Sequence, residues 1–285
     1  MRRIVPCLIL ALLTTAATPS GLPPEWTRST KPFRIVGPIH YVGTEGIAVY
    51  LVATSQGLIL LDGGLEENVS AIEANIAELG FRLGDVKLLL SSHAHYDHVA
   101  GLARLKRDTG AQLAASTGDV AALESGTPPS DISYGIYRFP PVKVDQPLFD
   151  GQRVFLGDIS MTPVSTPGHS PGCTTWTMRV AEGQRPLDVV FPCSLTVAGN
   201  KLVGNQGYPG IVKDFRYSFG KLSQLDADVV LPAHPELADV IGRARRRDAG
   251  DEDAFVASGL LDELVDQAEA VFETTLGSEL EESPQ

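Results

Sequence analysis

The sequence predicts a mixed α/β fold in which helices cover β-sheets. The first observation is a β-rich start, with strands expected over Phe33–Val36, Ile39–Val42, Ile47–Ala53 and Gly57–Leu61. The second is the largely apolar stretch Val86–Leu90, which is typical of a strand in a sheet covered on both faces. The third is the recurrence of amphipathic helical patterns between later strands. Together these favour layers of helix and sheet.

The first half of the chain alternates strands with helices. Asp62-Gly63-Gly64 closes the fourth strand, and helical spacing of apolar residues predicts a helix over Val69–Leu79 that ends at Gly80. A second helix is expected after residue 98, with Val99, Leu102 and Leu105 on one side and Gly110 as its end. The last elements expected in this half are a strand at Ala111–Ala115 and a short helix at Asp119–Leu123.

The second half repeats this order more loosely. Strands are expected at Val142–Val144, Arg153–Phe155, Ile159–Ser165, Thr174–Val180, Leu187–Phe191 and Asp228–Leu231. Apolar spacing predicts two more helices, over 211–225 and 261–272, whose apolar faces we interpret as packing surfaces rather than partner-binding surfaces. Residues 278–285 are expected to form a frayed tail.

The net charge argues against one class of function, nucleic-acid binding. The 285 residues carry a formal net charge of −12, so the phosphate backbone of a nucleic acid is not an expected partner. The basic run Arg243–Arg247 is followed directly by Asp248, Asp251, Glu252 and Asp253. We interpret it as a solvated segment that neutralises itself.

The N-terminus has the pattern of a secretory signal peptide. Two arginines follow Met1, an apolar core covers Ile4–Leu13, and small residues continue to Ser20. The apolar core is too short to span a bilayer. We therefore expect residues 1–20 to be removed, with cleavage at about 17–21, which leaves a single domain over 22–285 in the periplasm or the medium.

Export would place Cys173 and Cys193 in an oxidising compartment. The two cysteines stand at nearly equal distances from the centre of the turn-like segment 181–186, and an antiparallel hairpin around that turn would bring them opposite each other. This predicts a disulfide. The alternative is two small buried thiols, and a thiol titration of the unfolded protein distinguishes them.

The stretch 88–101 contains the highest concentration of candidate metal ligands, because His93, His95, Asp97 and His98 follow the apolar strand within six positions. Imidazole nitrogens and carboxylate oxygens are ligands that zinc prefers. A lone histidine would be assigned to the core or the surface. Four candidate ligands this dense would repel one another or remain desolvated without a cation between them. We predict a metal-binding loop and a two-metal site.

Two later histidines follow strands in the same way. His169 lies in a rigid Pro-Gly-His-Ser-Pro-Gly turn, and His234 follows the strand at 228–231. We expect His169 to complete the first metal site and His234 the second. Asp62 is either a turn residue or a group that orients a metal-bound histidine. The segment Ser125–Pro141 is a linker or a lid, and we favour a substrate-pocket wall.

Strand-end ligands in the order His-x-His-x-Asp-His, Pro-Gly-His and Ala-His resemble the metallo-β-lactamase superfamily, an αββα sandwich, from about Phe33 to the C-terminal helix. The motifs that are similar to its third subclass of true lactamases are Leu61-Asp62-Gly63-Gly64, Ser92–His98, Thr166–Trp176, Cys193-Ser194-Leu195 and Ala233-His234-Pro235. The resemblance implies two Zn²⁺ ions per chain. It implies that His93, His95 and His169 bind the first, and that Asp97, His98 and His234 bind the second.

The same resemblance implies a mechanism. A hydroxide shared by two zinc ions, held and oriented by Asp97, would attack a β-lactam carbonyl. Ser194 and Thr196 would contact the substrate carboxylate. Asn200 stands where family members often place a tyrosine that donates to the oxyanion, and its amide is the expected substitute. The expected partner is a small-molecule β-lactam, with no nucleic acid and no membrane after cleavage, and the protein is expected to be a monomer.

Three functions compete on these observations. The first is an exported two-zinc β-lactamase, the second a lactone or thioester hydrolase of the same superfamily, and the third a zinc-binding structural protein with closed coordination. Many relatives of the second kind carry a metal-bridging aspartate where this chain has Cys193-Ser194-Leu195. Another lactamase subclass uses a cysteine there, but His98 supplies the missing ligand and Cys193 has a prospective disulfide partner. The first function is therefore favoured.

Overall fold

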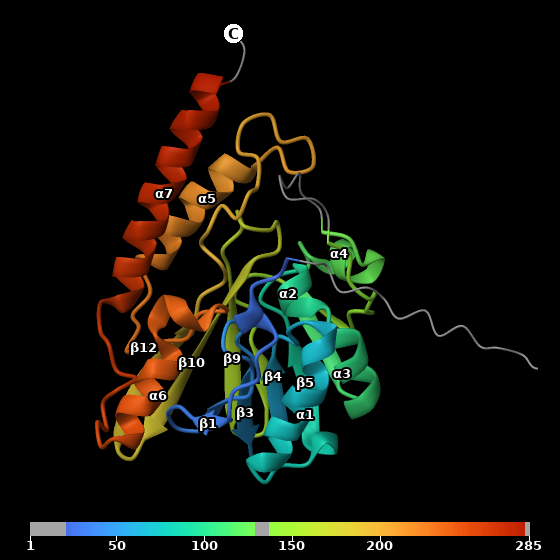
Figure 1. Cartoon of the computed structure of the whole chain (residues 1–285), viewed down its shortest axis with the longest axis vertical. Coiled ribbons are helices and arrows are strands. Elements are labelled where there is room, and N and C mark those ends of the chain that lie inside the picture. Colours follow the sequence, from blue (N-terminus) through green and yellow to red (C-terminus); the bar gives the residue numbers. More distant parts are fainter. Residues whose placement is uncertain (1–20, 129–136, 283–285) are drawn as a thin grey trace, which may run out of the picture.

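The computed structural model describes residues 21–128 and 137–282 and shows two β-sheets packed face to face between layers of helices (Figure 1). This arrangement confirms the predicted layered α/β sandwich. The predicted signal peptide, residues 1–20, lies outside the described residues. Across the described ranges, every helix is too short or too polar to cross a membrane.

The first sheet has seven strands in chain order. They are β1 (Phe33–Arg34), β2 (Ile39–Tyr41), β3 (Tyr50–Thr54), β4 (Gly57–Leu61), β5 (Val86–Leu90), β6 (Gln112–Ser116) and β7 (Gln146–Leu148). The pairs from β1 to β4 are antiparallel, whereas those from β4 to β7 are parallel. The carboxyl ends of β4, β5 and β6 therefore lie at one edge of the sheet, where ligands gather in parallel sheets.

The second sheet has five strands in the order β12-β11-β10-β9-β8. They are β8 (Val154–Leu156), β9 (Ile159–Ser165), β10 (Thr174–Glu182), β11 (Arg185–Phe191) and β12 (Val229–Val230). The hairpin of β10 and β11 pairs Trp176 with Phe191 at its open end and Glu182 with Arg185 at its turn. Both strands therefore continue further into the expected turn segment than the sequence suggested.

Helices cover the outer face of each sheet (Figure 1). The α-helices are α1 (Val69–Glu78), α2 (Tyr96–Val99), α3 (Leu102–Thr109), α4 (Val120–Ser125), α5 (Ile211–Leu222), α6 (Val240–Asp248) and α7 (Leu260–Glu282). The short 3-10 helices are η1 (Pro24–Trp26), η2 (Glu66–Asn68), η3 (Leu83–Asp85) and η4 (Pro235–Ala238). α1 and α3 pack on the first sheet, and α5 and α7 on the second.

Burial on both faces of β4 explains why its sequence is continuously apolar. Successive strand residues point to opposite faces. Leu58 and Leu60 pack into the cluster formed with α1 and α3. Ile59 and Leu61 point the other way, into the cluster between the sheets that also contains Trp176. Each strand residue of this run is therefore part of one of two cores.

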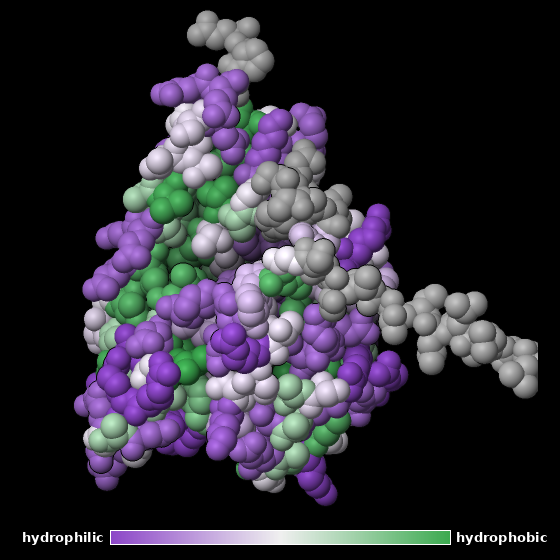
Figure 2. Space-filling model, viewed as in Figure 1, coloured by the Kyte–Doolittle hydropathy of each residue, from purple (hydrophilic) through white to green (hydrophobic). Residues whose placement is uncertain are grey.

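A third apolar cluster holds α5 and α7 against the second sheet. Its centre is aromatic, with the ring centroids of Phe215 and Phe272 5.1 Å apart and those of Phe219 and Phe272 5.6 Å apart. The coverage is incomplete, because Val271 on α7 is 60% exposed. On the face drawn in Figure 2, apolar surface (green) gathers along the side where these two helices lie.

The structure corrects the expected strand at Val142–Val144. The nitrogen of Val142 donates to Leu123 O at the end of α4, and β7 (Gln146–Leu148) instead pairs with β6. Both valines are still buried in the core beside α4. The apolar pattern of Val142–Val144 therefore indicates burial but not a strand.

The basic run Arg243–Arg247 is not a wholly solvated segment but part of α6. Val240 and Ala244 are buried on one side of this helix, and Arg243 donates to the carbonyl oxygens of Ala238 and Ala254. The charges of this run did not indicate that it belongs to a helix in which only one narrow face is packed.

The expected frayed tail is also corrected, because α7 continues to Glu282. The carboxylate of Glu279 accepts hydrogen bonds from the backbone nitrogens of Leu202 and Val203, each at 2.8 Å. These bonds hold the end of the helix against the segment that follows β11. Residues 283–285 lie outside the described residues.

Candidate metal centre

The first four candidate ligands follow β5, but only part of this stretch is a loop. The nitrogens of His98 and Val99 each donate to His95 O at 3.0 Å, so a single helical turn, α2, forms over Tyr96–Val99. His93 and His95 precede this turn, and Asp97 and His98 lie on it. This corrects the expectation that all four ligands lie on an irregular loop.

Gly63 and Gly101 allow α2 to pack against the end of β4. Gly63 N donates to His98 O at 2.8 Å, and Gly101 N donates to Gly64 O at 3.0 Å. A Cβ atom on Gly101 would lie 2.2 Å from Gly63 O, closer than atoms can approach. The Asp-Gly-Gly sequence after β4 therefore has a packing role, because it seats the helical turn that carries His98.

His169 and His234 reach the same place from the second sheet. His169 follows β9 in a turn whose Gly168 has a φ of +140°, and a Cβ there would lie 2.8 Å from Phe215. His234 follows β12, where Ala48 N donates to Ala233 O at 2.9 Å and ties the two sheets together. His234 is thus positioned by a contact between the sheets, and His169 by a turn that packs against Phe215 of α5.

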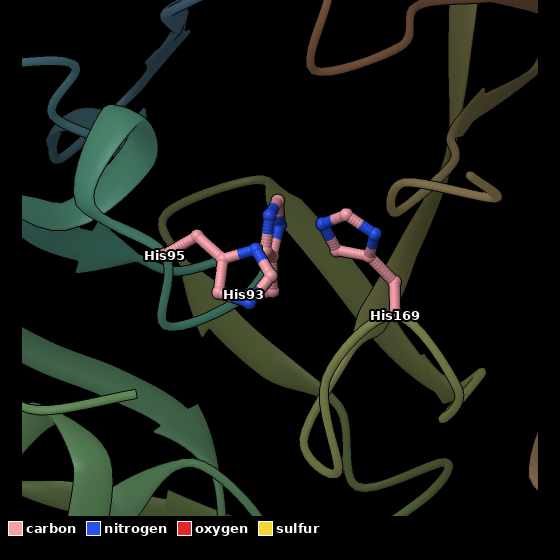
Figure 3. A group of neighbouring side chains, drawn as sticks. All are labelled: His93, His95 and His169. Atoms are coloured by element: carbon pink, nitrogen blue, oxygen red, sulfur yellow. The ribbon is translucent and has the colours of Figure 1, made fainter. Parts of the chain in front are cut away.

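The structure brings His93, His95 and His169 into one group, called here the three-histidine group. Their ligand nitrogens all lie within 4.8 Å of one another. The ring centroid of His93 lies 4.9 Å from that of His95 and 4.6 Å from that of His169. Figure 3 shows the three imidazoles gathered around a common space. This is the geometry expected for three ligands of one ion.

Asp97, His98 and His234 form a second group, called here the aspartate group. Asp97 Oδ2 lies 3.0 Å from His98 Nε2 and 3.3 Å from His234 Nε2. The ring centroids of His93 and His98 are 4.3 Å apart, so the two groups adjoin. All six predicted ligands therefore surround one small region.

The donor atoms of the three-histidine group fit a bound zinc ion. Asp62 accepts the hydroxyl proton of Ser92 at 2.7 Å, so Ser92 Oγ accepts in turn from His93 Nδ1 at 3.0 Å. His169 Nδ1 donates to Thr196 O at 2.7 Å. One nitrogen of each of these rings is thus fixed, as in metal-bound histidines. Among the described residues, the buried Nε2 of His93, the nitrogen that the Ser92 bond leaves available, has no hydrogen-bond partner, a costly state that a cation would relieve.

The electrostatic environment keeps these three imidazoles neutral. Burial lowers the pKa of His95 to about 4. Burial, together with the neighbouring histidines, holds the pKa values of His93 and His169 well below their ordinary value. Neutral imidazole is the form that binds metal, so no proton has to be removed near pH 7.

The aspartate group behaves differently because it contains a carboxylate. Burial disfavours the charge on Asp97, but the charge of His98 and the hydrogen bond from His234 outweigh it and hold the pKa of Asp97 well below its usual range. Burial also disfavours protonated His234, yet the hydrogen bond and charge of Asp97 raise the pKa of His234. The carboxylate of Asp97 and the imidazole of His234 therefore stabilise each other's charged forms.

Asp62 has the orienting position that the sequence suggested. It adopts a φ of +65°, and its carboxylate accepts Ser92 N and Ser92 Oγ, both at 2.7 Å. Its Oδ2 also lies 3.7 Å from His98 Nδ1. Asp62 thus touches His93 through Ser92 and stands beside His98, one ligand from each group.

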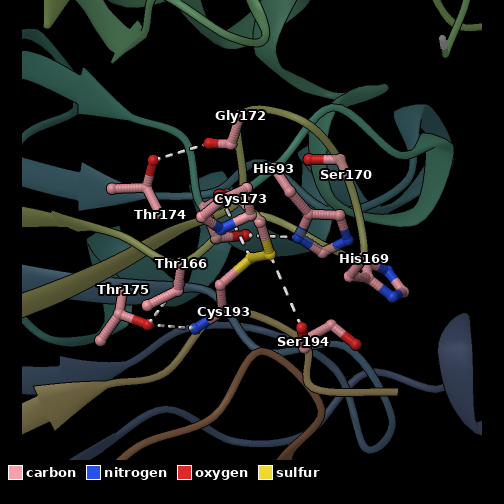
Figure 4. Close-up of a disulfide and its surroundings, with 12 residues drawn as sticks. His93, Thr166, His169, Ser170, Gly172, Cys173, Thr174, Thr175, Cys193 and Ser194 are labelled. Carbon is pink, nitrogen blue, oxygen red and sulfur yellow. Dashed lines mark hydrogen bonds between the residues drawn. A yellow bond between two sulfur atoms is a disulfide. The ribbon is translucent and has the colours of Figure 1, made fainter. Parts of the chain in front are cut away.

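The structure joins Cys173 and Cys193 in a disulfide, with their Cα atoms 5.8 Å apart, as the hairpin predicted (Figure 4). The bond lies just beyond the open end of the β10–β11 hairpin, next to His93. Because both sulfurs are bonded to each other, neither is a thiolate ligand. This agrees with the exclusion of Cys193 as a metal ligand.

The three predicted substrate contacts are placed unequally. Thr196 is exposed and lines the cavity beside the ligands. Ser194 is buried beneath it, with its Oγ 3.1 Å from Thr196 Oγ1. Asn200 is buried, and its amide donates to His169 O at 3.3 Å and Val197 O at 2.8 Å. The amide of Asn200 thus helps to hold the His169 turn, and a contact of Asn200 with substrate stays a prediction.

A cavity of about 280 Å³ opens beside both ligand groups. It is lined by ligands from both groups and by Leu22, Trp26, Pro128, Tyr137 and Ala198. Pro128 and Tyr137 belong to the segment expected to form a pocket wall, of which residues 129–136 lie outside the described residues. The sequence did not predict that Leu22 and Trp26 line the cavity. Trp26 is held there by long-range contacts, such as the bond from Asn68 Nδ2 to Trp26 O at 2.9 Å.

Known proteins share this arrangement. The family model described as the metallo-beta-lactamase superfamily matches residues 42–234. The chain is 43% identical to BJP-1, a subclass B3 metallo-beta-lactamase of Bradyrhizobium japonicum, with 90% of this chain and 97% of that chain covered and a TM-score of 0.87. It is 35% identical to the FEZ-1 metallo-beta-lactamase from Legionella gormanii, with 88% and 97% covered and a TM-score of 0.83.

Matches to curated proteins are shorter. A hydroxyacylglutathione hydrolase of Cereibacter sphaeroides is 34% identical over 101 residues, which are 35% of this chain and 31% of that protein. The chain thus spans about a third of the length of the curated relatives that it matches. The family model and the solved structures cover most of the chain and carry the assignment. The chain belongs to the metallo-β-lactamase superfamily and resembles its subclass B3.

Proposed function

We propose that the protein is an exported, two-zinc hydrolase that opens the ring of β-lactam antibiotics. The observation that carries the proposal is the meeting of the two ligand groups at the wall of one open cavity. The similarity to subclass B3 metallo-beta-lactamases over about nine tenths of the chain supports the substrate class. An open cavity beside the ligands argues against a structural zinc site with closed coordination.

The residues divide the work as follows. His93, His95 and His169 would hold one zinc ion, and Asp97, His98 and His234 a second. When bound, such a pair makes water available as a nucleophile near neutral pH, because zinc lowers its pKa to about 7, and it polarises a carbonyl group. No serine nucleophile is required.

The remaining steps belong to side chains of the chain itself. The low pKa of Asp97 leaves its carboxylate ionised, so it can accept a hydrogen bond from the attacking water and orient it toward the carbonyl. Thr196 lines the cavity beside the ligands and offers its hydroxyl to the substrate carboxylate. Trp26, with its ring centroid 5.6 Å from that of His234, forms a wall that limits access of water.

The cellular setting is part of the same proposal. The charged and apolar start of the sequence supports export, and the disulfide suits an oxidising compartment such as the periplasm. We propose a mature chain that acts as a monomer on a small molecule, without a nucleic-acid or membrane partner.

A thioester or lactone hydrolase is the second candidate. Two curated hydroxyacylglutathione hydrolases are 34% and 27% identical to this chain, over 101 and 126 residues respectively. The segment Cys193-Ser194-Leu195 argues for the lactamase, because it contains a disulfide cysteine and no carboxylate.

The deciding experiment is a spectrophotometric scan of a penicillin, a cephalosporin and a carbapenem with purified mature protein. We expect hydrolysis of at least one, loss of activity with a chelator, recovery with Zn²⁺, and no effect of serine-directed inactivators. A thioester and a lactone assayed in parallel supply the comparison. Main turnover on those esters, with negligible β-lactam opening, would contradict the proposal in favour of the second candidate.

A further inference from the structure

Asp119 is a buried carboxylate whose position is not explained by its own helix. It lies between β6 and α4, at the residue that precedes the helix, and is 1% exposed. Aspartate is common at this position because its side chain accepts hydrogen bonds from the first turn of the helix. Here the side chain makes no such bond with α4. The carboxylate must therefore find its donors elsewhere.

Those donors come from two separate segments of the chain. Asp119 Oδ2 accepts Ala94 N at 2.8 Å. Its Oδ1 accepts Gly172 N at 2.9 Å, and Ser170 Oγ donates to the carboxylate at 3.1 Å from Oδ2. Figure 4 shows Ser170 and Gly172 on the turn that carries His169. A carboxylate with this many donors is stabilised in the interior.

The donors are the immediate neighbours of three candidate ligands. Ala94 lies between His93 and His95, and Ser170 directly follows His169. The three-histidine group comes from two segments that are more than 70 residues apart in sequence and belong to different sheets, and Asp119 bonds to both segments. It therefore sets the distance between the two halves of this group.

The backbone around Asp119 is closely packed against the turn that carries His169. A Cβ on Gly172 would lie 2.3 Å from the carboxyl carbon of Asp119, and a Cβ on Gly118 would lie 2.7 Å from Pro171 O. The turn of His169 is thus pressed against the segment of Asp119, so a change in the carboxylate is transmitted to the ligand positions.

We propose that Asp119 is a positioning residue that pre-organises the three-histidine group for its metal ion. This inference rests on the proposed zinc binding, and it assigns Asp119 to one of the two sites. Partners that orient metal ligands from outside the ligand shell typically change metal affinity by about 10- to 100-fold when replaced. Asp62, by contrast, reaches one ligand of each group, through Ser92 to His93 and directly beside His98.

The test is the zinc affinity of Asp119→Asn, measured without turnover by competition with a chromophoric chelator. The amide keeps one acceptor oxygen and turns an NH₂ group toward a donor, so one of the two segments loses its tether. We expect one of the two sites to bind Zn²⁺ about 10- to 100-fold more weakly. We also expect a changed visible spectrum of the Co²⁺ form, because the spectrum reports the angles between ligands.

The matched control is Asn75→Ala. Asn75 is also a buried polar tether, which donates to Thr30 O and Val42 O, but it joins segments away from the ligands. It should lower the free energy of unfolding and leave both zinc affinities and the Co²⁺ spectrum unchanged.

The outcomes separate this inference from the proposed function. Wild-type protein that binds no zinc would refute the proposed function. Wild-type affinities and spectrum in a folded Asp119→Asn would overturn the inference alone. If that variant does not fold, Ser170→Ala replaces it and should weaken the same site several-fold, whereas an unchanged affinity would overturn the inference.

Discussion

The two ligand groups lie side by side but are stabilised in different ways. The three-histidine group contains only neutral, buried imidazoles. Among the described residues, the Nε2 atoms of His93 and His95 have no hydrogen-bond partner, and the same holds for both ring nitrogens of His98 in the aspartate group. The aspartate group contains a carboxylate paired with His98 and His234, and it is more open, with side chains of Asp97 and His234 15% and 19% exposed. The first group contains no charged side chain, whereas the second places the carboxylate of Asp97 beside two histidines and faces the cavity with Asp97 and His234.

The largest expected effect comes from removing the charge of the aspartate group. Asp97→Asn should reduce kcat/KM by about 100- to 1,000-fold, because an anion that positions the reacting water is lost. It should also lower the bound zinc from two ions to one per chain, since the three-histidine group is intact. Steady-state kinetics and elemental analysis of the same sample measure both.

Asp85→Asn is the matched control for this prediction. Asp85 lies at the opposite end of β5 and pairs with Arg82 on the surface. We expect wild-type zinc content and kinetics for this variant. If Asp97→Asn still bound two zinc ions, Asp97 would not be a ligand, and the assignment of the aspartate group as a metal site would be contradicted.

A smaller effect is expected from the disulfide, which supports the three-histidine side of the site. The double variant Cys173→Ala/Cys193→Ala opens a loop of sequence separation 20 and should lower the free energy of unfolding by about 3 kcal/mol. Urea unfolding of the zinc-loaded protein measures it. We expect zinc content to stay at two, because neither sulfur is a ligand. Loss of zinc at unchanged stability would show that the disulfide belongs to the site rather than to its scaffold.

The two groups should also respond to pH with opposite signs in the metal-free protein. The pKa of His95 is about 4 in the folded state against an ordinary 6.5, so the unfolded chain takes up the proton more readily. Acidification from pH 7 to 5 therefore costs about 2 kcal/mol of stability through His95. The pKa of His234 is raised, so its contribution is present below its unfolded pKa and is lost as the pH rises through its folded pKa.

Urea unfolding between pH 5 and 8 with chelator present tests these signs. His95→Ala should flatten the loss of stability toward acid, and His234→Ala should steepen it. The two variants are each other's control, because both remove one imidazole from the same cavity. Equal slopes in the two variants would contradict the electrostatic difference between the groups.

The smallest effect concerns the cavity wall beside the aspartate group. Trp26→Ala should change KM for β-lactams by several-fold and leave kcat and zinc content nearly unchanged, because the ring lines the cavity but contacts no reacting atom. Leu280→Ala, at an exposed apolar residue on α7, is the control with wild-type kinetics. A large drop in kcat in Trp26→Ala would mean that the ring also fixes His234.

The sequence was most informative where chemistry is local. Four candidate ligands occur within six positions after an apolar strand, and His169 and His234 each follow a strand end. The strands in question belong to different sheets, since β5 lies in the first and β9 and β12 in the second. The six residues could be grouped before their positions were known because the order of their motifs resembles that of a known family. The layered fold followed from similar local patterns of burial.

The sequence was least informative where a role depends on distant partners. Asp119 looks like any aspartate before a helix, but its partners lie 25, 51 and 53 residues away. Asn200 was assigned to substrate from its place along the chain, yet its amide bonds to the backbone of the His169 turn. Trp26 reached the cavity through a bond to Asn68, 42 residues away. Such contacts are set by the packing of the two sheets, which no local pattern encodes.

The number of zinc ions bound per folded chain is the most direct test of the central claim, that the two groups form a two-metal site. Elemental analysis of wild-type protein after removal of loose metal should give two. A folded sample without stoichiometric zinc would contradict the account, whatever its activity.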